Sequence, residues 1–163
     1  MRLFNFLKRQ NPNKKACIYF IQEKAIVFTQ YYIKKDTNTT IREYFSILES
    51  NCSEDILGEK ILHHLAYSKR LNIDISNYSA EFTKIFNSIG YKTMKSVTEF
   101  SQYISFEEKD NELIITPFTN INAGKKNQYF MRNPKAEISI LKPFQSIEIG
   151  KTTLRIKNEC LFK

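Results

Sequence analysis

The sequence predicts a single α+β domain built mostly from antiparallel strands, with two to three helices. Its 163 residues are about one domain's worth of chain. Apolar runs rich in Ile, Val, Phe and Tyr recur in pairs around short polar turns, which is typical of antiparallel hairpins. Two further segments carry apolar residues at helical spacing. We therefore expect residues 16–163 to form the domain, after a basic leader over residues 1–15 that can be mobile.

The first three predicted elements are strands. Ala16–Ile21 and Ala25–Ile33 are β-rich runs around the polar Gln22-Glu23-Lys24, which reads as a hairpin, and Lys34–Asn38 forms the next turn. Thr39–Leu48 combines helical spacing with residues that favour strands. We favour a strand there.

Two helices follow. Ser53 is a good N-cap, and the acids Glu54 and Asp55 suit the positive end of the helix dipole. An apolar stripe then continues along this first helix through Leu57, Ile61 and Leu65. The second helix is expected over about Ser79–Ile89, with Gly90 as its C-cap.

Strands return in the second half. Gln102–Glu107 and Glu112–Pro117 form a predicted hairpin, and Pro117 should end its strand or lie at a sheet edge. A long polar loop is expected over Thr119–Pro134, followed by a strand over Glu137–Leu141.

The last segment has two possible structures. Ser146-Ile147-Glu148-Ile149-Gly150 echoes Ser53 to Gly58 and so indicates a degenerate repeat of strands followed by a helix. Thr152, Thr153 and Ile156 are poor helix formers, so a terminal hairpin turning at Gly150-Lys151 is nearly as well supported. Gly58, inside the first turns of its helix, indicates close packing of that helix against a sheet.

Motifs for chemistry are missing from the sequence. His63 and His64 are consecutive on a helix and point about 100° apart, so they are interpreted as surface or boundary residues. The sequence contains no HExxH zinc motif, no GxSxG nucleophile elbow, and neither GxGxxG nor GxxxxGK[ST]. We therefore expect no catalytic residues, no metal and no cofactor, and a binding protein becomes the favoured class.

Cysteine usage and hydropathy bear on location. Cys17, Cys52 and Cys160 are odd in number and form no CxxC pair, which indicates free thiols in a reducing compartment. No run approaches the roughly 20 apolar residues of a membrane span, and the N-terminus lacks the features of a secretory signal. Cytoplasmic residence without membrane attachment is the prediction.

The net charge of +8 is concentrated in two places. Five positive charges lie in the leader and four between Thr119 and Ala136, and neither segment contains an acid, so the rest of the chain is close to neutral. In the second segment, Lys125 and Lys126 lie near Tyr129, Phe130 and Arg132. Cations mixed with aromatic residues can hold phosphates and stack bases, although a solvated loop also explains them.

Several segments together carry a family resemblance: Glu54-Asp55-Ile56-Leu57-Gly58-Glu59-Lys60-Ile61-Leu62, Leu65, Ser68-Lys69-Arg70, Phe82 through Gly90-Tyr91-Lys92, Glu112–Pro117 and Gly150. In these residues the chain resembles, between about Ser53 and Cys160, a family of bacterial contact-dependent growth inhibition (CDI) immunity proteins. The resemblance implies a cytoplasmic protein that binds a delivered toxin, frequently a nuclease, and does no chemistry itself. It also implies a Whirly-like arrangement of two antiparallel sheets.

The partner surface is predicted only from the basic loop. Lys125, Lys126, Tyr129 and Arg132 are the candidate toxin-binding residues. Immunity proteins against nucleases are often acidic, so this basic chain indicates a toxin with an acidic binding face. The alternative function is a single-stranded nucleic-acid-binding module of Whirly type. Nothing in the sequence indicates the oligomeric state.

Overall fold

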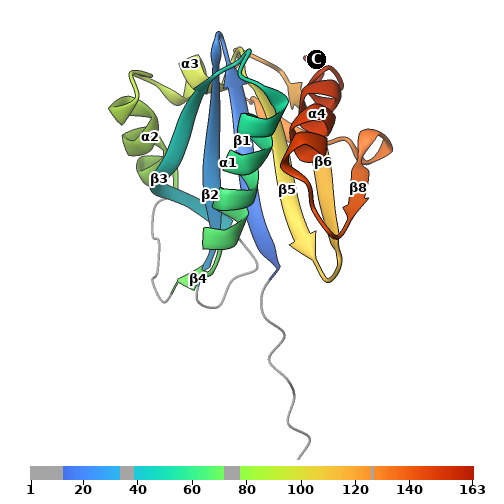
Figure 1. Ribbon diagram of the computed structural model, residues 1–163. Coiled ribbons are helices and arrows are strands. Elements are labelled where there is room, and N and C mark those ends of the chain that lie inside the picture. Colours follow the sequence, from blue (N-terminus) through green and yellow to red (C-terminus); the bar gives the residue numbers. More distant parts are fainter. Residues whose placement is uncertain (1–12, 34–38, 72–77, 126) are drawn as a thin grey trace, which may run out of the picture.

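The computed structural model describes residues 13–33, 39–71, 78–125 and 127–163 (Figure 1). Most of the predicted leader, residues 1–12, lies outside this part of the chain, as does the predicted turn Lys34–Asn38. Strand β1 begins at Lys14, so the last two residues of the predicted leader belong to the sheet.

The described strands form one eight-stranded sheet in the order β3-β2-β1-β5-β6-β7, with β4 paired to β2 and β8 to β6. Their bounds are β1 Lys14–Ile21, β2 Lys24–Ile33, β3 Thr39–Glu49, β4 Arg70–Leu71, β5 Gln102–Lys109, β6 Glu112–Ile121, β7 Tyr129–Arg132 and β8 Ile138–Leu141. The α+β class is confirmed, and every strand pairing except the parallel β2–β4 contact is antiparallel.

The structure has one sheet rather than the two predicted sheets, because β1 joins the two groups of strands. This strand pairs with β2 along one edge and with β5 along the other, through Lys14 to Phe20. It therefore satisfies its backbone on both sides and joins the N-terminal strands to the C-terminal ones. A pairing between segments more than 80 residues apart leaves no periodic signal in either strand.

In the described part of the chain, four α-helices cover the sheet: α1 Glu54–Tyr67, α2 Tyr78–Ser88, α3 Met94–Thr98 and α4 Ser146–Lys157. The two predicted helices are confirmed as α1 and α2, and Ser53 caps α1 by accepting a hydrogen bond from the amide of Ile56. The short α3 was not predicted. Thr93 and Ser96 form a capping box at its start.

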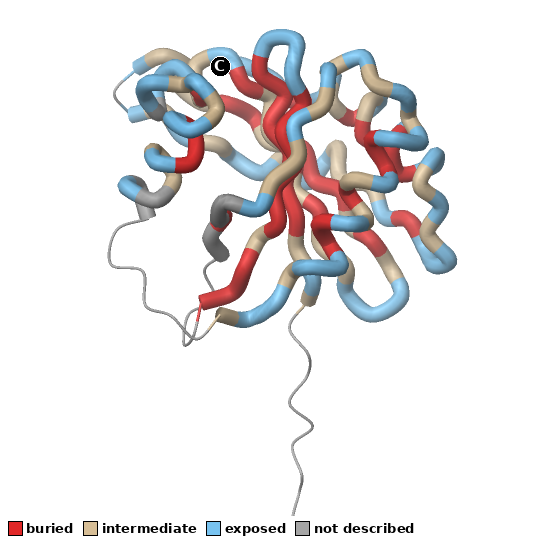
Figure 2. The backbone as a smooth tube through the Cα atoms, turned by 60° about the vertical axis from the view of Figure 1, so that its left-hand side comes forward, coloured by how far each residue is buried: buried red, intermediate tan, exposed pale blue. Residues whose placement is uncertain are grey.

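The helices divide between the two faces of the sheet, so each face has its own core (Figure 2). Helices α1 and α4 cover one face, where Leu57, Ile61 and Ile149 pack on strand residues such as Ile18 and Ile104. On the other face α2 and α3 cover a more aromatic core. Its members include Tyr19, Phe28, Phe82, Phe86, Tyr103 and Phe130.

Helices α1 and α4 cross at two glycines. A Cβ atom on Gly58 would overlap the backbone carbonyl of Ser146, and one on Gly150 would overlap the carbonyl of Glu54. Each glycine thus meets the residue four positions before the other, as in an antiparallel crossing with approximate two-fold symmetry. The close packing predicted for Gly58 is real, but its partner is a helix rather than a sheet.

The predicted terminal hairpin is wrong, and the repeated helix is confirmed as α4. Burial outweighs the low helix propensity of its threonines: Thr152 and Thr153 are both buried, and the Thr153 hydroxyl donates to the carbonyl of Ile149 at 2.7 Å. The strand predicted before it, over Glu137–Leu141, is confirmed as β8.

Pro117 does not end its strand, because β6 continues to Ile121. On the outer side of β6, β8 pairs as far as Ile115 and β7 begins at Phe118, which leaves a gap at Pro117. The carbonyl of Pro117 points to this side, where it accepts the amide of Asn133 at 3.0 Å. The missing N–H of proline therefore falls where no ladder bond is needed.

The predicted loop over Thr119–Pro134 is shorter than expected. Residues 119–121 continue β6 and residues 129–132 form β7, so the connection between the two strands runs only from residue 122 to residue 128.

Candidate functional site

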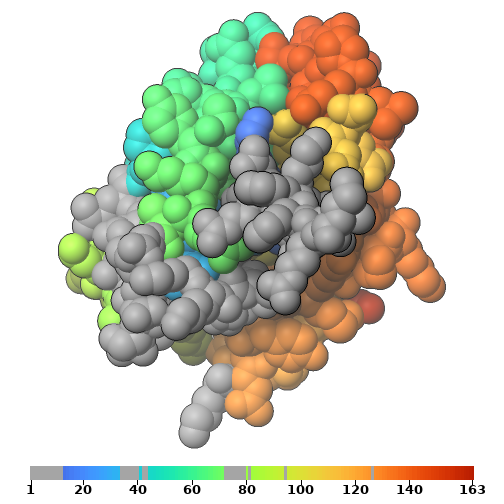
Figure 3. Space-filling view, turned by 90° about the horizontal axis from the view of Figure 1, so that it is seen from below, coloured from blue at the N-terminus to red at the C-terminus, as the bar shows by residue number. Residues whose placement is uncertain are grey.

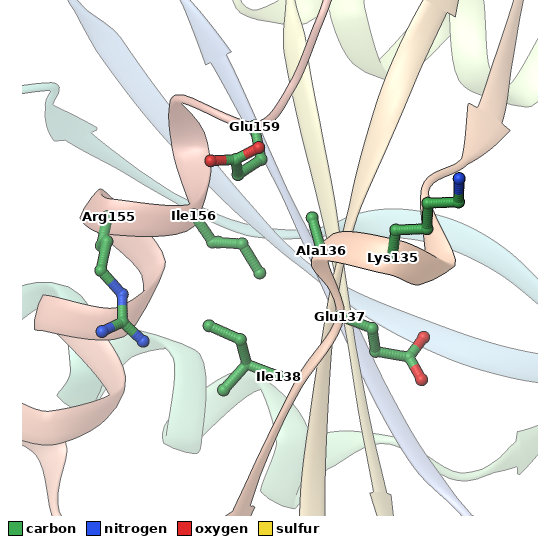
Figure 4. Close-up of a pocket in the computed structure, with 7 residues that line it drawn as sticks. All are labelled: Lys135, Ala136, Glu137, Ile138, Arg155, Ile156 and Glu159. Carbon is green, nitrogen blue, oxygen red and sulfur yellow. The ribbon is translucent and has the colours of Figure 1, made fainter.

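A groove lies between the last turns of α4 and the segment that leads into β8 (Figure 4). We call it the α4 groove. Its volume is about 360 Å³, and its lining residues come from the 3-10 helix η1 (Pro134–Ala136), the start of β8, and α4 with the turn after it. They are Lys135, Ala136, Glu137, Ile138, Arg155, Ile156 and Glu159.

The inside of the α4 groove is apolar. The side chains of Ile138 and Ile156 point toward one another across it (Figure 4). Ile156 is fully buried and belongs to the core beneath α4, whereas Ile138 is half-buried. Arg155 extends along one side of this pair, and Glu159 lies at the other end. The floor therefore continues the hydrophobic core to the surface.

One acid beside the groove already has a positively charged partner. The Glu137 carboxylate points away from the two isoleucines and accepts hydrogen bonds from Arg132 Nε at 3.1 Å, from Arg132 Nη2, and from Thr116 Oγ1 at 2.7 Å. Partial burial alone would raise the pKa of Glu137, but these bonds and the Arg132 charge lower it below its usual value. Glu137 is therefore ionised and paired at neutral pH.

The predicted partner-binding residues differ in exposure and in the contacts that they make. Tyr129 is 53% exposed, Lys125 is exposed, and Arg132 is exposed but paired with Glu137. Lys126 lies outside the described residues. Phe130, which added an aromatic ring to the predicted cluster, packs instead into the second core, 5.2 Å from the ring of Tyr103. The alternation of strand β7 thus leaves Tyr129 as its exposed ring.

The register of β7 places two side chains on the same side of the sheet as α4. Met131 lies opposite Thr119 and Tyr129 opposite Ile121, in the row of β6 that continues from the core residue Ile115. Met131 is 46% exposed. Half-exposed aromatic and methionine side chains are common in protein interfaces.

Sequence reasoning missed the α4 groove. Arg155 and Ile156 lie in the segment left open between helix and hairpin, and the groove's residues come from separate elements. Arg155 and Glu159 are one helical turn apart, but that spacing carries meaning only once α4 is known to be a helix.

A second exposed cluster lies where β3 meets α1. We call it the β3/α1 cluster; it consists of Tyr44, His63 and Tyr67. The ring centroids of Tyr44 and Tyr67 are 4.9 Å apart, as are those of His63 and Tyr67. The Tyr44 hydroxyl lies within hydrogen-bond distance of His63 Nε2. Partial desolvation, followed by the charge of the Tyr67 hydroxyl and a hydrogen bond to it, raises the pKa of Tyr44.

His64 lies behind this cluster and is buried, contrary to the predicted surface or boundary position. The Thr29 hydroxyl donates to the His64 backbone carbonyl at 3.1 Å, so it accepts the proton of Nδ1, 2.8 Å away. Nε2 lies 3.0 Å from the Ser46 hydroxyl. Burial, followed by the charges of His63 and Lys60, lowers the pKa of His64 to about 4. Its ring is neutral and structural.

The cysteines are free thiols, as predicted: Cys17 and Cys160 are buried and Cys52 is half-buried. Burial raises the pKa of the Cys160 thiol to about 11. Within the described ranges no three His, Cys, Asp or Glu residues gather as metal ligands. No helix in this same part of the chain has the length and apolar character to cross a membrane.

A domain whose apolar core opens into a charged surface groove has the features of a protein that binds a partner. A family model for CDI immunity proteins, CdiI, matches residues 14–156. The chain belongs to this family of CDI immunity proteins. A search of curated protein sequences finds no match.

Two solved structures share the fold. A protein of unknown function, NMB0488 from Neisseria meningitidis, aligns with a TM-score of 0.73 and 16% identity, covering 93% of this chain and 97% of that one. A CdiA-CT/CdiI toxin and immunity complex from Yersinia pseudotuberculosis contains a chain that aligns with a TM-score of 0.68 and 15% identity. That alignment covers 91% of this chain and 98% of that one.

Proposed function

We propose that this protein neutralises a cognate CDI toxin by binding it in the cytoplasm, without catalysis of its own, and that the toxin is a nuclease. The family match over residues 14–156 carries the proposal. The similar fold found in a toxin and immunity complex supports it. The nuclease activity and the cytoplasmic site follow from the resemblance described above.

The surface supports a binding role better than a catalytic one. Both histidines have other partners: His64 is bonded within the core, and His63 is joined to Tyr44. The side chains that remain exposed near the α4 groove and β7 are instead the types that interfaces use, namely Tyr, Met and Arg.

We propose that the toxin contacts the β7 edge through Lys125, Tyr129 and Arg132, together with Lys126. Positive charge on this edge favours an acidic face on the toxin, because complementary potentials speed association and suppress wrong partners. A stable complex would bury about 800 Å² on each partner.

Coexpression tests the proposed function. Cells that produce the toxin domain encoded next to this chain should survive when this protein is present and die when it is absent. The purified toxin should degrade DNA or RNA, and addition of this protein should stop the degradation. Cell death despite intact, folded protein would contradict the immunity function, and a toxin that leaves nucleic acids intact would contradict the nuclease.

A single-stranded nucleic-acid-binding module is the second candidate, supported by the exposed Lys125 in the connection before β7 and the exposed Tyr129 at the start of β7. Phe130 packs half-buried against the second core, which removes one of the two rings available for stacking and weakens this candidate. If several phosphates are contacted, affinity should fall roughly 10³-fold or more between 50 and 200 mM salt. Absence of binding at low salt would rule this function out.

A further inference from the structure

We propose that the α4 groove receives an apolar side chain of the toxin with a carboxylate next to it in the toxin chain. This inference rests on the proposed function and adds a specific anchor point to it. Arg155 would hold the carboxylate, while Ile138 and Ile156 would contact the apolar side chain.

The size and exposure of the groove favour a segment of a protein over a free small molecule. A volume of about 360 Å³ is at the low end of small-molecule pockets, which enclose most of the ligand's surface. Here Lys135, Arg155 and Glu159 are all exposed, so the groove is open to solvent along its rim. One or two protruding side chains fit such a groove, while the rest of the partner covers the rim.

The charges of the groove specify what should lie next to the apolar side chain. Glu137 is paired with Arg132 and turned away from the groove. Among the described residues, no ion pair involves Arg155 or Lys135. The Arg155 guanidinium therefore remains available beside the apolar floor, where a carboxylate could accept two parallel hydrogen bonds from it.

A second copy of this chain is a poorer occupant. It would carry the same net charge of +8, so its approach would be opposed rather than favoured by Arg155 and Lys135. Tyr129 and Met131, exposed on the side of the sheet that holds α4, provide further contact area for a partner seated on the groove.

Two substitutions test the anchor. Arg155→Glu reverses the charge on the groove, and Ala136→Trp fills the groove from η1. Both should weaken binding of the purified toxin domain by roughly 10- to 100-fold in titration calorimetry, because the first replaces the group that holds the carboxylate with a like charge and the second blocks the apolar floor. Lys151→Glu is the matched control. Lys151 is exposed one turn earlier on α4 and does not line the groove, so this variant should bind within about threefold of wild type.

Unchanged circular dichroism and melting temperature would confirm that the variants fold. If wild type binds the toxin and both groove variants bind equally well, the anchor is wrong while the immunity function stands. If wild type fails to bind, the proposed function itself fails. Loss of self-association in the groove variants, with toxin binding intact, would make a second copy the occupant and overturn the proposal.

Discussion

The β3/α1 cluster and the α4 groove both expose apolar or aromatic side chains, but they differ in what those side chains already contact. In the cluster, Tyr44 is bonded to His63 and the rings pack on one another. In the groove, two isoleucines border unfilled volume next to Arg155, which makes no ion pair among the described residues. Exposure alone therefore does not identify a binding surface. Unfilled apolar volume beside an available charge is a more specific sign.

The crossing of α1 and α4 supports both surfaces, since α1 carries two residues of the cluster and α4 forms one wall of the groove. Gly58→Ala should lower the free energy of unfolding by about 3 kcal/mol or more, because the added methyl overlaps the Ser146 backbone and cannot be relieved by a side-chain rotation. Denaturant unfolding measures this. Because both surfaces rest on this crossing, the substitution should disturb the β3/α1 cluster and the α4 groove together.

Gly90→Ala provides the comparison for that substitution. Gly90 has a φ of +96° and open space around its Cβ position, so alanine there should cost only about 1–2 kcal/mol of backbone strain. Equal losses at the two positions, or a stabilised Gly58→Ala, would mean that the helices do not meet at Gly58.

The stability of the protein should depend on pH through His64, which lies buried behind the β3/α1 cluster. The pKa of His64 is about 4 when folded, against a usual value of 6.5, so the unfolded chain binds a proton that the folded chain does not. Above about pH 6.5 the His64 ring is neutral in both states, so the free energy of unfolding has its full value. As the pH falls toward 4, protonation of the unfolded chain lowers the free energy of unfolding by up to about 3 kcal/mol. Unfolding measured across this range should show the decline.

His64→Gln should flatten that decline, since glutamine does not titrate. His63→Gln is the control because it leaves the buried ring in place. A slope that persists in His64→Gln would assign the pH dependence to other groups and remove His64 from this role.

Arg132→Ala should have the smallest effect. Arg132 is exposed, so its ion pair with Glu137 contributes at most about 1 kcal/mol. Removing it should raise the pKa of Glu137 toward its usual value, which carbon-detected NMR titration can follow. A large loss of stability would indicate that Arg132 packs the groove wall and is not simply a surface charge.

Periodicity predicted much of the fold but little of the site. The hairpin of β1 and β2, the Ser53 cap and the stripe of α1 follow from local patterns, and these are confirmed. The structure of the last segment depended on burial of Thr152 and Thr153 under a helix crossing, which no local pattern reveals. The single sheet likewise depends on the distant pairing of β1 with β5.

The site was harder to predict because its parts are distant in sequence. Tyr129 and Arg132 were identified by composition, yet the sequence could not show that Arg132 neutralises Glu137 or that Phe130 points into the core. Arg155 was missed because its role comes from facing Ile138 across the groove. The space-filling view from below shows α1, in teal and green, beside the orange-red segment around the start of α4, so segments about 90 residues apart in sequence share one surface (Figure 3).

The most direct test compares the two surfaces in one experiment. The dissociation constant of the purified toxin domain is measured for wild type, Arg155→Glu and Tyr67→Ala, with Tyr67→Ala removing an exposed ring of the β3/α1 cluster. We expect tight binding by wild type, roughly 10- to 100-fold weaker binding by Arg155→Glu, and a change of less than about threefold for Tyr67→Ala. The reverse pattern would contradict the α4 groove as the toxin-binding surface and assign that role to the cluster.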